Sequence, residues 1–435
     1  MKKNSSVIVL IVLNLYLILC MSFFPESVQE KNDIQNKPTT EGLHAAVFDI
    51  DITPPISYKM PYGVVINTWD LGLRAKGIVL SGPGEPVVLV SLDWLGIAND
   101  CYDEFKRSLA RAAGTTPERV AVHVVHQHDA PYPRDFINDN FALSVIHRLE
   151  MAVASSFENF IPVTHIGFGE AQVYGVASNR RILGVEGKVK AMRWTACKDS
   201  TLRAEPEGLV DAKLSAVSFW NEDKPVAVLN FYATHPQSYY GTGVPNPDYP
   251  GIARFYRQLA VPDALQVYFT GAGGNVGAGK YNDGSQENRG VLAERVADGM
   301  NRAWENSKRS LVATSDIKWS VEPVSLPLDS VKAGKVLWER YRKGKKVDLQ
   351  CLTVGDKARI LFMPGELLVE YQIAARKMCP DLFLAMAAYG DLGFGYIPPA
   401  AAFPQGGYEA DIAKVTPEAE KVLLNAISKL LNDKN

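Results

Sequence analysis

Residues 120–135, VAVHVVHQHDAPYPRD, contain the side chains best suited to chemistry. The segment begins with β-branched residues, which are typical of a buried strand, and reaches His126 and His128 before Pro131 ends regular strand pairing. Two histidines at i and i+2 point to the same side of a strand if it extends that far. With Asp129 beside them, they are suited to metal binding or acid/base chemistry. A pair of loop histidines with structural hydrogen bonds is the alternative, and the HxH pair alone does not decide between the two.

Further polar side chains follow other apolar runs that have the composition of buried strands. They are His235 after 225–232, a glycine-rich loop at 271–277 after 265–270, Glu366 after 359–363, and Tyr396 after 382–389. Ligand sites in α/β sheets collect beyond the carboxyl ends of strands, so we expect these residues to converge with the histidines. Each alone has a simpler explanation: Glu366 as a helix N-terminal acid and Tyr396 as a packed aromatic residue.

Zinc would suit these donor types. It accepts neutral imidazole, carboxylate and occasionally phenolate ligands, and a catalytic zinc lowers the pKa of a bound water to about 7. Two histidines, one Glu and one Tyr supply enough donors, which leaves a remaining histidine as a base or a hydrogen-bond partner of the substrate.

Nucleotide-binding and serine-hydrolase motifs do not fit the sequence. The loop that starts at Gly271 does not satisfy GxGxxG, Lys280 is followed by Tyr281 rather than Ser or Thr, and no GxSxG occurs. We therefore expect its glycines to let the backbone approach a ligand or metal closely. For Asp51 and Asp93, which end predicted strands, we expect turn capping.

The elements that must position these residues alternate between strands and helices. Beyond the runs named above, strands are predicted at 45–52, 73–80 and 86–94, and helices at 102–113, 141–158, 286–306, 367–377 and 416–431. This order predicts an α/β fold of mixed β-sheets flanked by helices, in one large catalytic domain with its site loops at the carboxyl ends of strands.

The composition is that of an ordinary globular protein. Of 435 residues, 47% are hydrophobic and 22% charged, and the net charge is −2. The near-neutral balance gives no reason to expect nucleic acid as a partner, and no feature indicates a protein partner. We expect a small-molecule or lipid substrate.

The N-terminus indicates export. Lys2 and Lys3 precede an apolar run at 7–24, typical of a signal peptide, although an uncleaved membrane anchor is an open alternative for residues 1–24. Residues 25–41 are polar and predict a flexible tether, followed by the catalytic domain at 42–435. Cys20 stands where a lipoprotein cysteine could, although Leu19 is bulkier than such sites prefer. The expected location is periplasmic, extracellular or membrane-anchored.

The remaining cysteines are widely spaced. They are Cys101, Cys197, Cys351 and Cys379, and none forms a CxxC pair. This spacing excludes a zinc knuckle but allows one or two disulfides in an exported protein.

Taken in order, the motifs resemble the neutral ceramidase family, the zinc-dependent non-lysosomal amidases. The similarity covers about residues 42–412. The matching segments are DITPP at 51–55, RAK at 74–76, SLD at 91–93, HQH at 126–128, NR at 179–180, 230–236, DYPG at 248–251, GNVG at 274–277, GE at 365–366, Tyr396 and YEA at 408–410.

The resemblance implies roles for individual residues. Zinc would be held by His126, His235, Glu366 and Tyr396. The scissile amide or the substrate would be approached by His128, Arg180 and Tyr408. It also implies a zinc-activated water that attacks an amide carbonyl, with cationic or phenolic groups stabilising the oxyanion. An N-acyl lipid is the expected substrate, with ceramide as the type.

The substrate-facing loops depart from the family pattern. Asn275 and Gly277 replace the Asp and Ser of the family's GDVSPN segment beside Gly274, and Asp129-Ala130-Pro131-Tyr132 replaces Ser-Gly-Pro-Gly. The chain also ends near 435, so the C-terminal immunoglobulin-like domain of full ceramidases is expected to be absent. Metal-dependent hydrolysis is thus better supported than ceramide as substrate. A hydrolase of a carbohydrate or another ester or amide, and an inactive binding protein of the same fold, are the alternatives.

Overall fold

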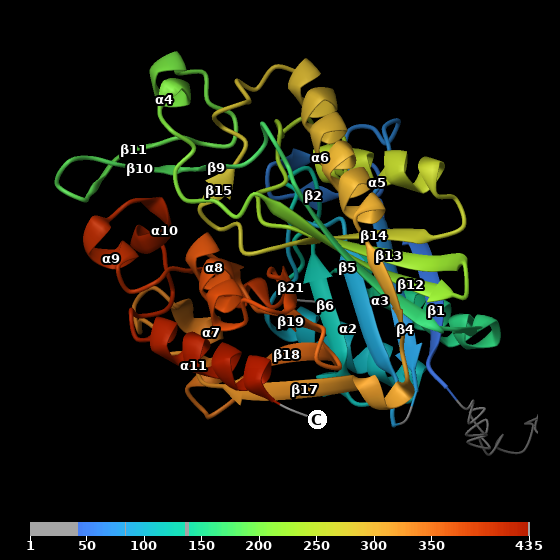
Figure 1. The fold of residues 1–435 in the computed structure, drawn as a ribbon. Coiled ribbons are helices and arrows are strands. Elements are labelled where there is room, and N and C mark those ends of the chain that lie inside the picture. Colours follow the sequence, from blue (N-terminus) through green and yellow to red (C-terminus); the bar gives the residue numbers. More distant parts are fainter. Residues whose placement is uncertain (1–41, 83, 135–138, 434–435) are drawn as a thin grey trace, which may run out of the picture. The chain divides into compact units, whose positions relative to one another are not determined.

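The predicted alternation of strands and helices is present in the computed structural model, which describes residues 42–433 except 83 and 135–138 (Figure 1). The predicted export signal, the tether and Cys20 lie outside the described residues. Within the described part, no helix is both long and apolar enough to cross a membrane.

One order of elements occurs three times in this part of the chain: an antiparallel strand pair, a helix, and a third strand parallel to the second. The first unit is β4 (Arg74–Ser81), β5 (Val87–Leu92), α2 (Asn99–Ala113) and β6 (Val120–Val124). The second is β12 (Lys213–Asn221), β13 (Lys224–Tyr232), α5 (Asp248–Ala260) and β14 (Leu265–Thr270). The third is β18 (Val347–Val354), β19 (Ala358–Phe362), α8 (Val369–Met378) and β21 (Phe383–Ala387).

Each unit forms the centre of one sheet. The sheet orders are β6-β5-β4-β1-β7, β14-β13-β12-β8-β16 and β17-β18-β19-β21. The added strands are β1 (His44–Asp51), β7 (Ile161–Pro162), β8 (His165–Gln172), β16 (Lys308–Leu311) and β17 (Ile317–Val324). The helix of each unit provides the crossover that a parallel strand pair requires. The prediction of mixed sheets flanked by helices is confirmed.

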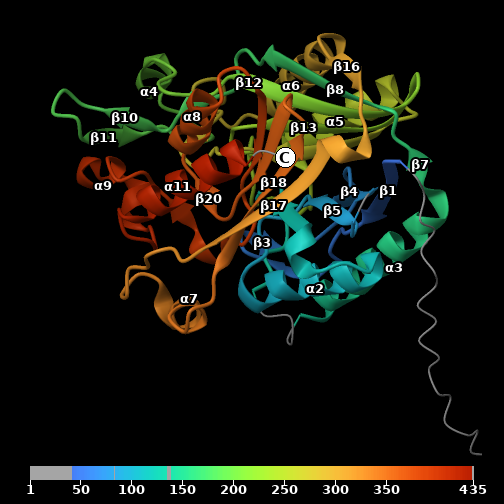
Figure 2. The same cartoon turned by 60° about the horizontal axis from the view of Figure 1, so that its bottom comes forward.

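The inner faces of the three sheets share one hydrophobic core. Ile78, Leu229 and Ile360, one from each sheet, are at most 1% exposed within it. Pairs of helices cover the outer faces: α2 with α3 (Asn140–Ser156), α5 with α6 (Glu287–Glu305), and α8 with α11 (Ala419–Asn432) (Figure 2). Strands buried on both faces need apolar residues throughout, which explains the near-continuous apolar runs in the sequence.

Short elements connect and extend the sheets. They are β2 (Lys59–Met60), β3 (Gly63–Val64), β9 (Ser178–Asn179), β10 (Arg181–Leu183), β11 (Val189–Met192), α4 (Ser200–Ala204), β15 (Val276–Gly277), α7 (Gly334–Tyr341), β20 (Glu366–Leu367), β22 (Tyr396–Ile397), α9 (Ala402–Gln405) and α10 (Tyr408–Asp411).

The structure forms no disulfide at Cys197, Cys351 or Cys379, although the sequence allowed one or two. All three are buried thiols. Burial raises the pKa of the Cys351 thiol to about 12, so this side chain behaves as a small apolar group.

Candidate metal centre

His126 is held by backbone groups just beyond the end of β6. The strand ends at Val124 and does not extend as far as His126 and His128, so both histidines lie in the loop that follows it. His126 has a φ of +72°, and its N–H donates to the carbonyl oxygen of Trp94 at 2.9 Å. Its Nδ1 lies 2.6 Å from the carbonyl oxygen of Leu95. Because a carbonyl only accepts, Nδ1 is the donor, and Nε2 of the neutral ring keeps its lone pair.

His235 is prepared in the same way beyond β13. Its Nδ1 lies 2.7 Å from the carbonyl oxygen of Gly273 in the glycine-rich loop. The Tyr249 hydroxyl donates to the His235 carbonyl at 2.6 Å. Both histidines therefore present Nε2, with Nδ1 fixed by a backbone acceptor, an arrangement that orients imidazoles for metal binding.

Glu366 and Tyr396 are neighbours because β20 pairs in parallel with β22. Glu366 Oε2 lies 3.3 Å from His126 Nε2 and 3.4 Å from His235 Nε2. The Tyr396 hydroxyl lies 3.4 Å from His235 Nε2. The ligand atoms of His126, His235 and Glu366 lie within 4.8 Å of one another, so these three side chains could hold a metal ion.

The electrostatics of the cluster suit a cation. Burial and the Arg180 charge lower the pKa of His235 to about 4, so its imidazole is neutral at pH 7. Glu366 Oε2 is buried and has no hydrogen-bond partner in the described part of the chain. A buried carboxylate oxygen without a donor is costly, and two facing imidazole lone pairs cannot supply one.

The four side chains fit zinc by donor type. Two imidazole nitrogens, one carboxylate and one phenol are ligands that zinc accepts, and the Nδ1 atom of each histidine already donates to a backbone carbonyl. Burial raises the pKa of Tyr396 well above its usual value, so without a cation the phenol stays neutral.

His128 lies beside this cluster, and its ring contacts the rings of two tyrosines. Its ring centroid is 5.4 Å from that of His126, 4.7 Å from the stacked Tyr62 ring and 4.6 Å from the edge-on Tyr240 ring. Burial, with the neighbouring histidines, lowers its pKa well below the usual value. Nδ1 has no hydrogen-bond partner among the described residues, so a neutral His128 can exchange a proton or hydrogen bond with a substrate.

Arg180 brings a fixed positive charge to the opposite side of the cluster. Its Nη2 donates to the Tyr396 hydroxyl at 3.2 Å and to Glu409 Oε1 at 2.8 Å. Burial lowers its pKa, but Tyr396 and Glu409 outweigh that effect and the net shift is upward. Tyr408 is 39% exposed and contacts the Tyr396 ring edge-on at 5.6 Å. The structure thus brings together all seven residues predicted as ligands or catalytic groups.

The predicted substrate-loop residues make contacts that hold the surrounding loops together. Asp129 accepts hydrogen bonds from the backbone N–H of 241 at 2.8 Å and from the Thr242 hydroxyl at 2.8 Å. A Cβ on Gly274 would lie 2.7 Å from the Glu366 carbonyl oxygen, so glycine allows this close approach. Asn275 and Gly277 are buried: the Asn275 amide contacts Glu370, and Gly277 pairs with β9.

Sequence reasoning missed several neighbours of the cluster. Tyr389 has a φ of +64° and stacks on His126, with 4.6 Å between ring centroids. Glu409 is completely buried and joins Arg180 to Arg181 through its two carboxylate oxygens. No sequence signal marks the Tyr389 conformation. Glu409, in contrast, belongs to the YEA segment at 408–410 that carried part of the family resemblance.

Comparison with solved structures identifies the fold. The chain superimposes on the crystal structure of neutral ceramidase from Pseudomonas aeruginosa with a TM-score of 0.68 and 12% identity, over 90% of this chain and 74% of that one. It superimposes on a ceramidase complexed with C2 with a TM-score of 0.64 and 13% identity, over 90% and 75% of the two chains. No protein-family model and no curated protein sequence matches the chain. The chain therefore has the fold of the neutral ceramidases, and the resemblance carried by its motifs is confirmed for the fold.

Proposed function

We propose that this protein is an exported zinc-dependent hydrolase that cleaves the amide bond of an N-acyl substrate. The observation that carries the proposal is the cluster of His126, His235 and Glu366, whose ligand atoms lie within 4.8 Å, with Tyr396 beside them. The fold shared with neutral ceramidases supports amide hydrolysis as the reaction class.

His126, His235, Glu366 and Tyr396 would hold the zinc. Zinc bound there would supply Lewis-acid chemistry and a water of lowered pKa. Arg180, a cation whose Nη2 contacts the Tyr396 hydroxyl, would stabilise negative charge that develops on the carbonyl oxygen. Neutral His128, fixed by its two tyrosines, would exchange a proton with the reacting groups.

Aromatic side chains on two sides of the cluster support a substrate with an apolar part. Tyr62 and Tyr240 lie 4.8 Å apart on the His128 side. Trp194 and Tyr408 lie 5.1 Å apart on the Tyr396 side. All four rings are 39–45% exposed, so their faces are available to an acyl group.

Export rests on the N-terminal sequence. Lys2 and Lys3 followed by the apolar run 7–24 are typical of a signal peptide or anchor. An N-acyl lipid outside the cytoplasm is consistent with both the export signal and the exposed aromatic rings beside the cluster.

Turnover decides between this enzyme and an inactive binding protein of the same fold. The purified, zinc-loaded protein is incubated with fluorescent ceramides and N-acyl amino acids, and released amine and fatty acid are measured. We expect product from at least one substrate and a loss of more than 100-fold in kcat/KM for Glu366→Ala. Binding of these substrates without product, and with Glu366→Ala changing affinity alone, would contradict the proposal.

A further inference from the structure

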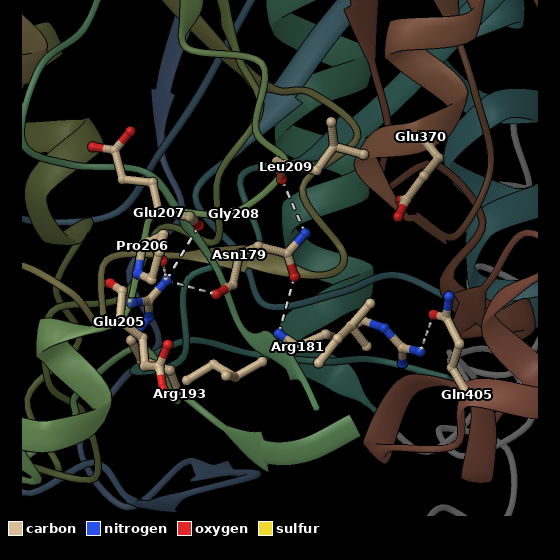
Figure 3. Close-up of a pocket in the computed structure, with 12 residues that line it drawn as sticks. Asn179, Arg181, Arg193, Glu205, Pro206, Glu207, Gly208, Leu209, Glu370 and Gln405 are labelled. Atoms are coloured by element: carbon tan, nitrogen blue, oxygen red, sulfur yellow. Dashed lines mark hydrogen bonds between the residues drawn. The ribbon is translucent and has the colours of Figure 1, made fainter. Parts of the chain in front are cut away.

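A second cavity lies outside the metal cluster. Its volume is about 460 Å³, which is within the range of small-molecule sites. It is enclosed by β9, β10, the 205–209 segment, the start of α8 and the end of α9 (Figure 3). Its described lining includes none of the four side chains of the metal cluster.

Two residues separate this cavity from the catalytic side of Arg180. Glu409 Oε1 accepts from Arg180 and Oε2 accepts from Arg181, so the carboxylate is shared between the two regions. The Asn275 carbonyl accepts from the Arg180 N–H at 2.7 Å, and its side-chain amide contacts Glu370. The cavity therefore adjoins the metal centre but has its own wall.

The positive charges on the cavity wall are already neutralised or enclosed. Arg181 donates to Glu409, to the Ala402 carbonyl and to Gln405. The Arg193 guanidinium donates to five backbone carbonyls, those of Asn179, Leu202, Glu205, Pro206 and Glu207. Among the described residues, neither guanidinium forms an ion pair with Glu370, the acid on the opposite part of the wall.

Glu370 on the same wall has no such partner. Its carboxylate contacts the Asn275 amide at 3.0 and 3.2 Å, and among the described residues no Lys or Arg forms an ion pair with it. A carboxylate has about four acceptor sites, so this amide leaves acceptor capacity unused. Burial raises the pKa of Glu370 by more than its own backbone N–H, the Asn275 amide and the Arg181 charge lower it. A bound cation would remove that penalty.

Other parts of the wall fit the body of a small organic molecule. Ile182, Leu183 and Leu209 provide apolar surface, and Arg193 Nε is buried without a hydrogen-bond partner in the described structure. Figure 3 shows Glu370 across the cavity from the 205–208 segment. Unused acceptor sites on Glu370 in a cavity with apolar walls indicate a site for a ligand that carries a hydrogen-bond donor.

We propose that this cavity binds a small primary amine, whose ammonium group pairs with Glu370 while its apolar body packs on Ile182, Leu183 and Leu209. The three donors of an ammonium group match the unused acceptor sites of the carboxylate. Binding requires no metal, because no lining residue belongs to the metal cluster.

Calorimetric titration of the purified protein at pH 7.5 tests this site with hexylamine, and with hexanol and hexanoate as matched probes. We expect saturable 1:1 binding of hexylamine, at least tenfold weaker binding of hexanol, and none of hexanoate. Glu370→Gln should weaken hexylamine binding at least tenfold, whereas Glu207→Gln on the 205–209 segment should change it less than threefold. Equal affinity for hexylamine in wild type and Glu370→Gln would overturn the proposal.

Two further variants keep the test independent of folding and of the proposed hydrolysis. Leu209 is 49% exposed, so Leu209→Arg should fold normally, place a competing cation in the cavity and abolish hexylamine binding. His126→Ala should bind hexylamine as the wild type does even if it lacks metal and activity. Loss of binding in His126→Ala, or full binding in Leu209→Arg, would show that the amine binds elsewhere.

Discussion

Replacement of Asp93 by Asn tests how the end of β5 is held beside the metal centre. Asp93 is completely buried and accepts two hydrogen bonds from Arg254, at 2.7 and 2.6 Å. The carbonyls of Trp94 and Leu95, the next two residues, accept from His126. The sequence predicted turn capping for Asp93, whose loss costs about 1 kcal/mol. Breaking a buried ion pair costs about 3–5 kcal/mol, because it leaves an unpaired charge.

The structure therefore predicts a large fall in melting temperature for Asp93→Asn. An unfolding entropy of about 2.1 cal/mol/K per residue over about 390 described residues gives about 0.8 kcal/mol/K, so 3–5 kcal/mol corresponds to a decrease of about 4–6 °C. The assay is differential scanning calorimetry in the presence of a chelator, so that metal binding does not contribute. The same variant should bind zinc more weakly, because it loosens the segment that holds His126.

Two matched variants separate burial from charge. Asp298→Asn breaks an exposed pair with Arg302, in which Asp298 is 61% exposed, and should shift the melting temperature by less than 1 °C. The double variant Asp93→Asn/Arg254→Met removes the unpaired charge and should recover part of the loss. A melting temperature for Asp93→Asn within 1 °C of wild type, or equal to that of Asp298→Asn, would refute the reasoning.

Three other predictions concern the surroundings of the site. The Tyr389 ring stacks on His126, while its buried hydroxyl has no hydrogen-bond partner among the described residues. In a competitive chelator titration, Tyr389→Phe should therefore keep zinc affinity within threefold and Tyr389→Ala should lose at least tenfold. Equal losses in the two variants would contradict this. Burial lowers the pKa of His123 from about 6.5 in the unfolded chain to about 4 in the folded protein. Between these pH values the unfolded state binds more protons than the folded state. The free energy of unfolding should therefore fall as pH decreases from 6.5 to 4, by at most about 3 kcal/mol. Urea titrations should show a flatter dependence for His123→Gln, and an unchanged slope would exclude this group. Gly277→Ser restores the serine of the family segment, but its Cβ would lie 2.6 Å from Thr195 Cγ2. In the same titrations this variant should lower the free energy of unfolding by about 1–3 kcal/mol. An added Thr195→Ala should recover the loss, and a stabilising effect of Gly277→Ser would contradict the observed packing.

Much of the fold was predictable because the sheets are buried on both faces. Runs such as 225–232 and 265–270 are apolar almost throughout, so the predicted strands agree with β13 and β14 to within one residue. The convergence of His126, His235 and Glu366 followed from a general property of α/β sheets, whose functional loops lie beyond the carboxyl ends of strands.

The remaining features depend on information that residue types do not contain. The left-handed conformations of His126 and Tyr389 cannot be read from composition, and together they form a ring stack beside the His126, His235 and Glu366 cluster. The ββαβ order that occurs three times is defined by strand pairing, and no repeated sequence accompanies it. The buried Asp93–Arg254 pair joins β5 to α5 across 161 positions of the chain, a distance that local patterns do not bridge.

Metal content tests the central claim most directly. Purified wild-type protein, His126→Ala, His235→Ala and the control His147→Ala, whose side chain is 71% exposed, are dialysed against zinc-containing buffer and then metal-free buffer. Bound metal is measured by mass spectrometry, with circular dichroism to verify folding. We expect about one zinc per chain in wild type and His147→Ala, and less than a tenth of that in the other two variants. Folded wild-type protein without zinc, or zinc retained by His126→Ala and His235→Ala, would contradict the central claim.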